Sequence, residues 1–154
     1  MVSENEKIVE ISIKNISDYK ALSIIKKARQ ICSIYNSILL LKSRIDIAQI
    51  ADCDGVSLNI NEDISPHDAK KFLHDDKIIS CLVSKNHNCD ILNEINCDII
   101  LLKKEFISGL KLNLNGLDLI DYLIAKINKI IFFDEEFIKE NKIDNNSKIK
   151  IFRV

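Results

Sequence analysis

The chain lacks threonine and tryptophan altogether, and it has only three glycines and one proline. The glycines lie far apart in the sequence and form no G-x-G-x-x-G turn, which argues against an open dinucleotide-binding sheet. No apolar run approaches the roughly 20 residues that a membrane-spanning helix needs, so we expect no membrane partner. Only three arginines are present, so a phosphate site would depend on lysine or on backbone N–H groups.

Net charge and cysteine usage limit the possible partners and the location of the protein. The formal net charge is −1, with no basic excess that would favour a nucleic acid. The five cysteines form no C-x-x-C pair, and most lie in or beside apolar segments. This usage predicts buried reduced thiols. The polar N-terminal sequence has no secretory pattern, so we expect the cytoplasm as the location.

Two kinds of segment alternate along the 154 residues. Short runs rich in Ile, Val and Leu predict buried strands at 8–13, 37–41, 55–58, 77–83, 98–102, 129–133 and 148–152. Helical periodicity or helix-start signals predict helices at 17–35, 45–51, 66–73, 88–95, 117–127 and 134–141.

This β-α alternation predicts an α/β fold with parallel strands. We expect a single domain over residues 1–154, a TIM-barrel-like βα-barrel that is incomplete with about seven strands. An open α/β sheet is the alternative. A repeat supports regular units, since Cys53-Asp54 and Cys97-Asp98 each lead into a predicted strand.

In a βα-barrel, functional side chains follow the carboxyl ends of the strands. Lys14, Lys42 and Asp63 lie at three such ends and could bind a phosphorylated ligand together with a hard metal ion. The alternative is that all three are solvated loop charges. The acidic run 134–136 suits either a metal cluster or the first turn of a helix.

The chain resembles the thiamine-phosphate synthase and TenI (thiazole tautomerase) family of βα-barrels in four ordered stretches. VEISIKNIS at 9–17 resembles V-Q-L-R-x-K-x-x-S, and LKSRIDIA at 41–48 resembles I-N-D-R-x-D-x-A. CDGVSL at 53–58, continuing to Asp63 and to AKKFL at 69–73, resembles A-D-G-V-H-L-G-Q-x-D-L and A-R-x-L-L. CDI at 97–99 resembles a later A-D-Y.

The resemblance implies a barrel that joins a pyrimidine pyrophosphate to a thiazole phosphate with Mg²⁺ on the pyrophosphate. It places Lys14 on the pyrophosphate and Asp63 on the metal. Glu10 replaces the family's glutamine, and Lys42-Ser43 replaces its Asn-Asp pair. The family's Thr-x-Thr-Lys loop is absent, and its glycine-rich phosphate turn falls on residues 131–135, which contain no glycine. We therefore expect no synthase activity.

Two functions remain open from the sequence. The first is a non-catalytic relative that acts by contact with other proteins, as a homodimer or with a partner enzyme covering an open barrel edge. The second is a residual enzyme of the thiamine pathway, either thiazole tautomerase-like or a thiamine-phosphate synthase, or a binder of a phosphorylated molecule of that pathway. Its candidate residues are Lys14, Lys42, Glu10 and Asp63.

Overall fold

A computed structural model describes residues 8–61, 64–83, 88–114 and 116–141. The chain divides into two compact units, Met1–Ser80 and Cys81–Val154, with the division falling inside one strand. The single domain expected over residues 1–154 stays a prediction. The expected strand at 148–152 lies outside the described residues, as do Glu62 and Asp63.

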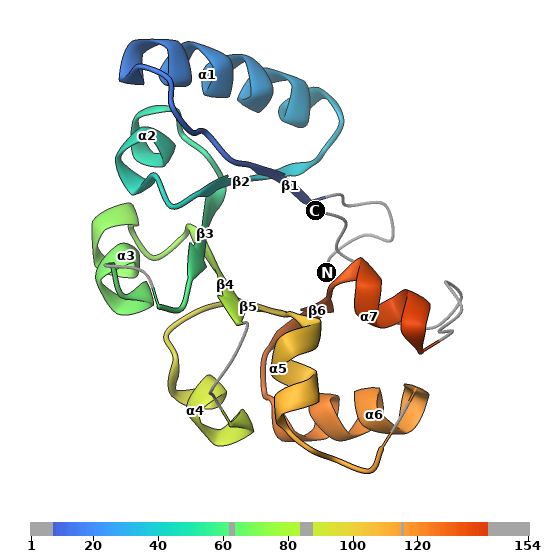
Figure 1. Ribbon diagram of the computed structural model, residues 1–154. Helices are drawn as coiled ribbons and strands as arrows, with labels where there is room; N and C mark the ends of the chain where they lie inside the picture. The colour runs from blue at the N-terminus through green and yellow to red at the C-terminus, as the bar shows by residue number, and fades with distance from the viewer. Residues whose placement is uncertain (1–7, 62–63, 84–87, 115, 142–154) are drawn as a thin grey trace. The chain divides into compact units, whose positions relative to one another are not determined.

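The first unit is built from three complete βα repeats (Figure 1). Helices α1, α2 and α3 lie on one side of its strands in that view. Its elements are β1 (Ile8–Ile11), α1 (Asp18–Ile34), β2 (Ile38–Lys42), α2 (Ile45–Ile50), β3 (Gly55–Asn59), α3 (Pro66–Leu73) and the first part of β4 (Ile78–Val83).

The second unit continues the same alternation after the end of β4. Its one departure is a pair of helices between two successive strands. Its elements are α4 (Cys89–Glu94), β5 (Ile99–Leu102), α5 (Lys104–Gly109), α6 (Gly116–Lys126), β6 (Ile130–Phe133) and α7 (Glu135–Glu140).

The strands are hydrogen-bonded in their sequence order, from β1 to β6. The β1–β2, β2–β3 and β5–β6 pairs are parallel, with registers that include Glu10 opposite Leu40 and Lys42 opposite Ser57. A doubly wound sheet would instead reverse its strand order at a switch point. The structure therefore confirms an incomplete TIM-barrel-like α/β fold and excludes the open doubly wound alternative.

Helix boundaries follow the local sequence signals closely. The Ser65 hydroxyl accepts a hydrogen bond from the Asp68 N–H at 3.1 Å, and Pro66 occupies the first turn of α3. The Asn88 side chain caps α4 through the Ile91 N–H at 2.8 Å. The sequence prediction missed α5, which is only six residues long and ends at a glycine, so it shows too little periodicity to be detected.

The contacts of Asp134 decide whether the acidic run 134–136 is a metal cluster or the first turn of a helix. One of its carboxylate oxygens accepts from the Phe137 N–H of its own helix, and the other accepts from the Lys104 N–H that begins α5, both at 2.9 Å. Glu135 pairs with Lys139 one turn later at 2.9 Å. The run is therefore a helix start, with one carboxylate capping two helices.

The region where the family's glycine-rich phosphate turn would fall is filled by aromatic side chains. Phe133 ends β6, and its ring stacks on that of Phe137 with centroids 5.2 Å apart. Both rings are almost fully buried. These side chains occupy space beside the strand end that glycines would leave open to an anion.

The core of the first unit lies between the strands and their helices. Leu39 and Leu41 of β2 and Val56 and Leu58 of β3 alternate along their strands on one face, and each is at most 1% exposed. Ala21 and Ile25 of α1 are completely buried. The five cysteines are also buried and free, as the sequence predicted (Cys32, Cys53, Cys81, Cys89 and Cys97).

Gly55 is the position in this core where a side chain has no room. A Cβ atom there would lie 2.0 Å from the Ile78 carbonyl oxygen, because the backbones of β3 and β4 approach closely. At Gly109 an added Cβ would meet nothing within 4 Å.

We expect Gly55→Ala to lower the free energy of unfolding by about 2 kcal/mol or more, since the strands must separate to admit the methyl group. Gly109→Ala is the matched control and should cause no loss. Urea denaturation followed by circular dichroism measures both. Equal stability of the two variants would contradict the close approach.

Candidate functional site

Polar side chains gather on the face of β1, β2 and β3 that is opposite the apolar core. Paired residues of parallel strands point to the same side of the sheet, and alternate residues of a strand share a face. The registers pair Glu10 with Leu40 and Lys42 with Ser57, so Glu10, Lys42, Ser57 and Asn59 share this face. We call these four residues the polar face.

Its charged members lie close enough to interact. The Lys42 Nζ atom is 3.9 Å from the Glu10 Oε1 atom. Both side chains are largely shielded from water, at 29% exposure for Lys42 and 11% for Glu10. Water screens such a pair less than it would on an open surface. The structure thus brings together two of the four residues proposed from the sequence.

The neutral members extend the polar face along β3. Ser57 is 2% exposed, and the Asn59 Oδ1 atom is buried with no hydrogen-bond partner among the described residues. The sequence analysis proposed neither Ser57 nor Asn59 as a site residue. The signal was available, because serine interrupts an otherwise apolar strand at a position that alternates with the core residues.

The loop that follows β2 has a constrained backbone. Ser43 adopts a positive φ of 59°, which is uncommon for a residue other than glycine, and its N–H donates to the Ser57 carbonyl at 2.9 Å. Arg44 then turns toward carboxylates, with NH2 lying 2.8 Å from oxygens of both Asp18 and Asp46. These hydrogen bonds raise the pKa of the guanidinium and lower that of Asp46, so Arg44 is already engaged.

The other two predicted site residues are not part of this cluster. Lys14 follows β1 as an exposed side chain and makes no hydrogen bond or ion pair within the described part of the chain. Asp63, the expected metal ligand, lies outside the described residues. Their roles in binding stay predictions.

The described polar face suits a magnesium ion poorly. Its carboxylate, Glu10, already faces the ammonium group of Lys42. Across residues 8–61, 64–83, 88–114 and 116–141, no three His, Cys, Asp or Glu side chains are grouped as metal ligands. A hard cation prefers several oxygen ligands, and here a lysine side chain stands beside the one acid.

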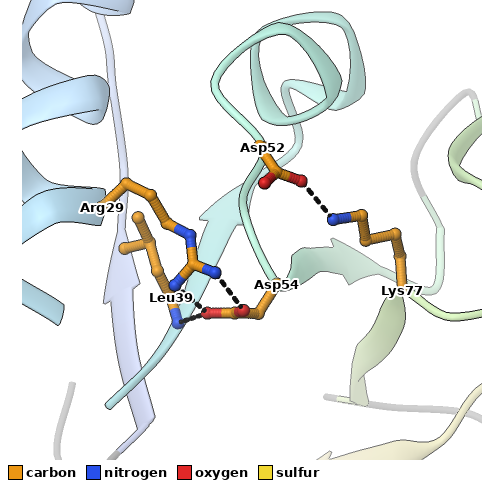
Figure 2. A network of polar contacts seen from close by, with 5 residues as sticks. All are labelled: Arg29, Leu39, Asp52, Asp54 and Lys77. Atoms are coloured by element: carbon orange, nitrogen blue, oxygen red, sulfur yellow. Dashed lines mark hydrogen bonds and ion pairs between the residues drawn. The ribbon is translucent and has the colours of Figure 1, made fainter. Parts of the chain in front are cut away.

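A second polar network lies at the opposite, amino-terminal ends of the strands (Figure 2). Arg29 of α1 contacts both carboxylate oxygens of Asp54 at 3.0 and 3.1 Å, and the Leu39 N–H donates to that carboxylate at 2.8 Å. Nearby, Lys77 Nζ lies 2.6 Å from Asp52. Residues at this end of a βα-barrel serve stability rather than chemistry.

Sequential parallel strands, helices between them and polar side chains toward the carboxyl ends define this chain as a TIM-barrel-like α/β protein. Comparison with known proteins narrows the class. Residues 1–132 match the family model for thiamine monophosphate synthase. The chain therefore belongs to the thiamine monophosphate synthase/TenI family, which relates it to thiamine biosynthesis.

Individual relatives agree with this assignment. The chain is 31% identical over 104 residues to thiamine-phosphate synthase of Clostridium novyi (strain NT), covering 68% of this chain and 50% of that protein. It is 30% identical over 141 residues to the thiamine-phosphate synthase of Prochlorococcus marinus (strain AS9601), covering 89% of this chain and 39% of that one. The chain thus spans half or less of these curated relatives.

A solved structure shows the same fold. Thiamine phosphate pyrophosphorylase from Pyrococcus furiosus superposes with a TM-score of 0.72 at 19% identity, over 96% of this chain and 72% of that one. Among the described helices, none is long and apolar enough to cross a membrane.

The Arg29–Asp54 network gives a stability prediction. Asp54→Ala removes a charged acceptor from Arg29 and leaves the Leu39 N–H unpaired, so we expect a loss of about 2–3 kcal/mol in the free energy of unfolding. Asp52→Ala is the matched control, because the Asp52 side chain is 79% exposed and surface pairs contribute under about 1 kcal/mol. Chemical denaturation of both variants is the measurement. A smaller loss for Asp54→Ala than for Asp52→Ala would contradict this role.

Proposed function

We propose that this chain is a thiamine monophosphate synthase-family protein without synthase activity, which binds a phosphorylated molecule of the thiamine pathway at the polar face. The observation that supports it most is the 3.9 Å pair between Lys42 and Glu10. A lysine that faces a carboxylate has its charge partly neutralised before any ligand arrives.

The Lys42–Glu10 pair should impair the synthase reaction more than it impairs the binding of a phosphorylated ligand. Departure of a diphosphate group requires positive charge that is already placed and free to stabilise the developing anion. Here Glu10 competes for the Lys42 ammonium, and Arg44 is held by Asp18 and Asp46. A ligand phosphate can still displace the carboxylate from Lys42, at a cost in affinity.

The neutral residues of the polar face favour binding of a small polar ligand. Ser57 offers a hydroxyl, and Asn59 has a buried amide oxygen that lacks a partner among the described residues. Buried polar atoms are normally hydrogen-bonded, so an unpaired oxygen on this face supports a ligand donor as its partner. Magnesium is not needed for this mode of binding.

A residual tautomerase-like enzyme is the second candidate, and Glu10 is the residue that favours it. Its carboxylate is only 11% exposed and lies beside a lysine, so it could take a proton from a bound substrate and return it at another atom. Such a reaction needs no diphosphate departure, and Glu10→Gln would abolish it.

Calorimetric titration tests the binding proposal, with thiazole phosphate, thiamine phosphate and the pyrimidine pyrophosphate, each with and without magnesium. We expect saturable binding of at least one compound that Lys42→Ala weakens about 10-fold or more, through loss of one charged contact. Glu10→Gln should preserve or tighten binding, because it removes the competitor for Lys42. Lys77→Ala, in the opposite network, is the control and should leave affinity unchanged.

Turnover assays then separate the two candidates. The proposal expects no thiamine phosphate from the two synthase substrates above the uncatalysed rate. Formation of that product by the purified chain would overturn it, as would failure of all three compounds to bind. Tautomerisation that is lost in Glu10→Gln would favour the second candidate.

Association with another protein is a separate proposal. It is supported by the same replaced positions, because a family member that does not catalyse synthesis could act through protein contacts. We propose a homodimer or a complex with a partner enzyme of the pathway. Sedimentation velocity of the purified chain over a range of concentrations is the test. If the chain is a monomer at all concentrations, the homodimer proposal is wrong.

A further inference from the structure

The loops that follow β1 and β2 are joined by one guanidinium group. Arg44 lies immediately before α2, and its Nη2 atom is 2.8 Å from an oxygen of Asp18, the first residue of α1. The same guanidinium contacts both oxygens of Asp46, through Nε at 3.0 Å and Nη2 at 2.8 Å. A planar guanidinium with several N–H donors can bind two carboxylates at once in a fixed geometry. Arg44 therefore links the starts of two successive helices.

The backbone before Arg44 attaches this link to the polar face. Ser43 has a φ of 59°, and the Arg44 N–H donates to the Lys42 carbonyl at 2.8 Å, which closes a tight turn. The Ser43 N–H donates to the Ser57 carbonyl, so the turn is also fixed to β3. The Arg44 side chain therefore starts from a defined place, two residues after Lys42.

The loop 12–17, between β1 and α1, carries Lys14 and is held at both ends. Its start follows β1, which is paired with β2, and its end precedes Asp18, which contacts Arg44. Between these points the Lys14 side chain is exposed, and Asn15 bends the chain with a φ of 58°. The contact between Asp18 and Arg44 is thus one of the constraints that place Lys14.

The Asp18–Arg44 contact should add little to global stability. The side chain of Asp18 is 80% exposed, and that of Arg44 is 32% exposed. Water screens such ion pairs, and holding two side chains in one geometry costs entropy. The Arg29–Asp54 network at the opposite strand ends already joins α1 to β2. An effect of the Asp18–Arg44 contact should therefore appear in the loop and its ligand rather than in unfolding.

We propose that Arg44 is a positioning residue: by holding Asp18, it places loop 12–17 so that Lys14 reaches the phosphate of a ligand bound at the polar face. This inference rests on the proposed function, because it assigns Lys14 to the phosphate group of the same ligand. Arg44 acts on the ligand through the position of Lys14.

The variant Asp18→Asn separates positioning from charge, because the two effects have opposite signs. Loss of a negative charge near the site would by itself tighten the binding of an anion. Loss of the Arg44 contact should instead weaken binding about 3- to 10-fold, measured by calorimetry with whichever of thiazole phosphate, thiamine phosphate and the pyrimidine pyrophosphate binds most tightly. Asp52→Asn is the matched control, because that carboxylate is 79% exposed and also belongs to an ion pair, and it should leave affinity unchanged. Unchanged or tighter binding by Asp18→Asn would overturn the proposal.

A double-mutant cycle identifies the group through which Arg44 acts. Lys14→Ala should weaken binding, and Asp18→Asn should cause no further loss of affinity in the Lys14→Ala background. The same loss in both backgrounds would show that the contact affects the ligand independently of Lys14, and the proposed role would be wrong.

Hydrogen exchange distinguishes a failure of this inference from a failure of the proposed function. In the absence of ligand, Asp18→Asn should raise the exchange rates of the amides of loop 12–17 several-fold, while the amides of β2 keep their protection. If none of the three compounds binds to the unsubstituted chain, the proposed function fails, and the role of Lys14 fails with it. Binding together with unaltered exchange in the loop would overturn the role of Arg44 alone.

Discussion

The carboxylate of Asp54 is the constraint on which the first unit depends. It joins Arg29 of α1 to the Leu39 N–H at the start of β2. The backbone of Asp54 continues the linkage, since its N–H donates to the Leu39 carbonyl at 3.1 Å and its own carbonyl accepts from the Ile78 N–H at 2.9 Å. One residue thus connects a helix and three successive strands.

The Asp54 contacts lie at the amino-terminal ends of the strands, and the polar face lies toward the carboxyl ends. The first helps to set the strand register on which the second depends. With Leu39 held beside Asp54, Lys42 pairs with Ser57 and shares a face with Glu10. A shift of one residue would turn Lys42 toward the helices and bring Leu41 to the polar face, because side chains alternate along a strand. The strand register therefore determines which side chains form the polar face.

The proposed function rests on how this face departs from a synthase. Where the resemblance implies an Asn-Asp pair, β2 ends at Lys42 and Ser43 follows it, and the Lys42 ammonium lies beside the carboxylate of Glu10 in β1. Where the resemblance implies a glycine-rich phosphate turn, the structure has the stacked rings of Phe133 and Phe137. The fold of the family persists. The resemblance implies that several groups that would neutralise a diphosphate are replaced, and the proposal of binding without synthesis rests on these replacements.

The sequence by itself determined the alternation of strands and helices and most of their boundaries, with α5 as the exception among the described elements. The apolar runs are continuous, and signals such as Ser65 with Pro66 act within one helical turn, so neighbouring residues suffice. It did not reveal α5, the double capping by Asp134 or the Lys42–Glu10 pair. These depend on strand register and on residues distant in the chain. Only tertiary structure brings such groups together, because their separation in sequence carries no information about which face of a strand they share.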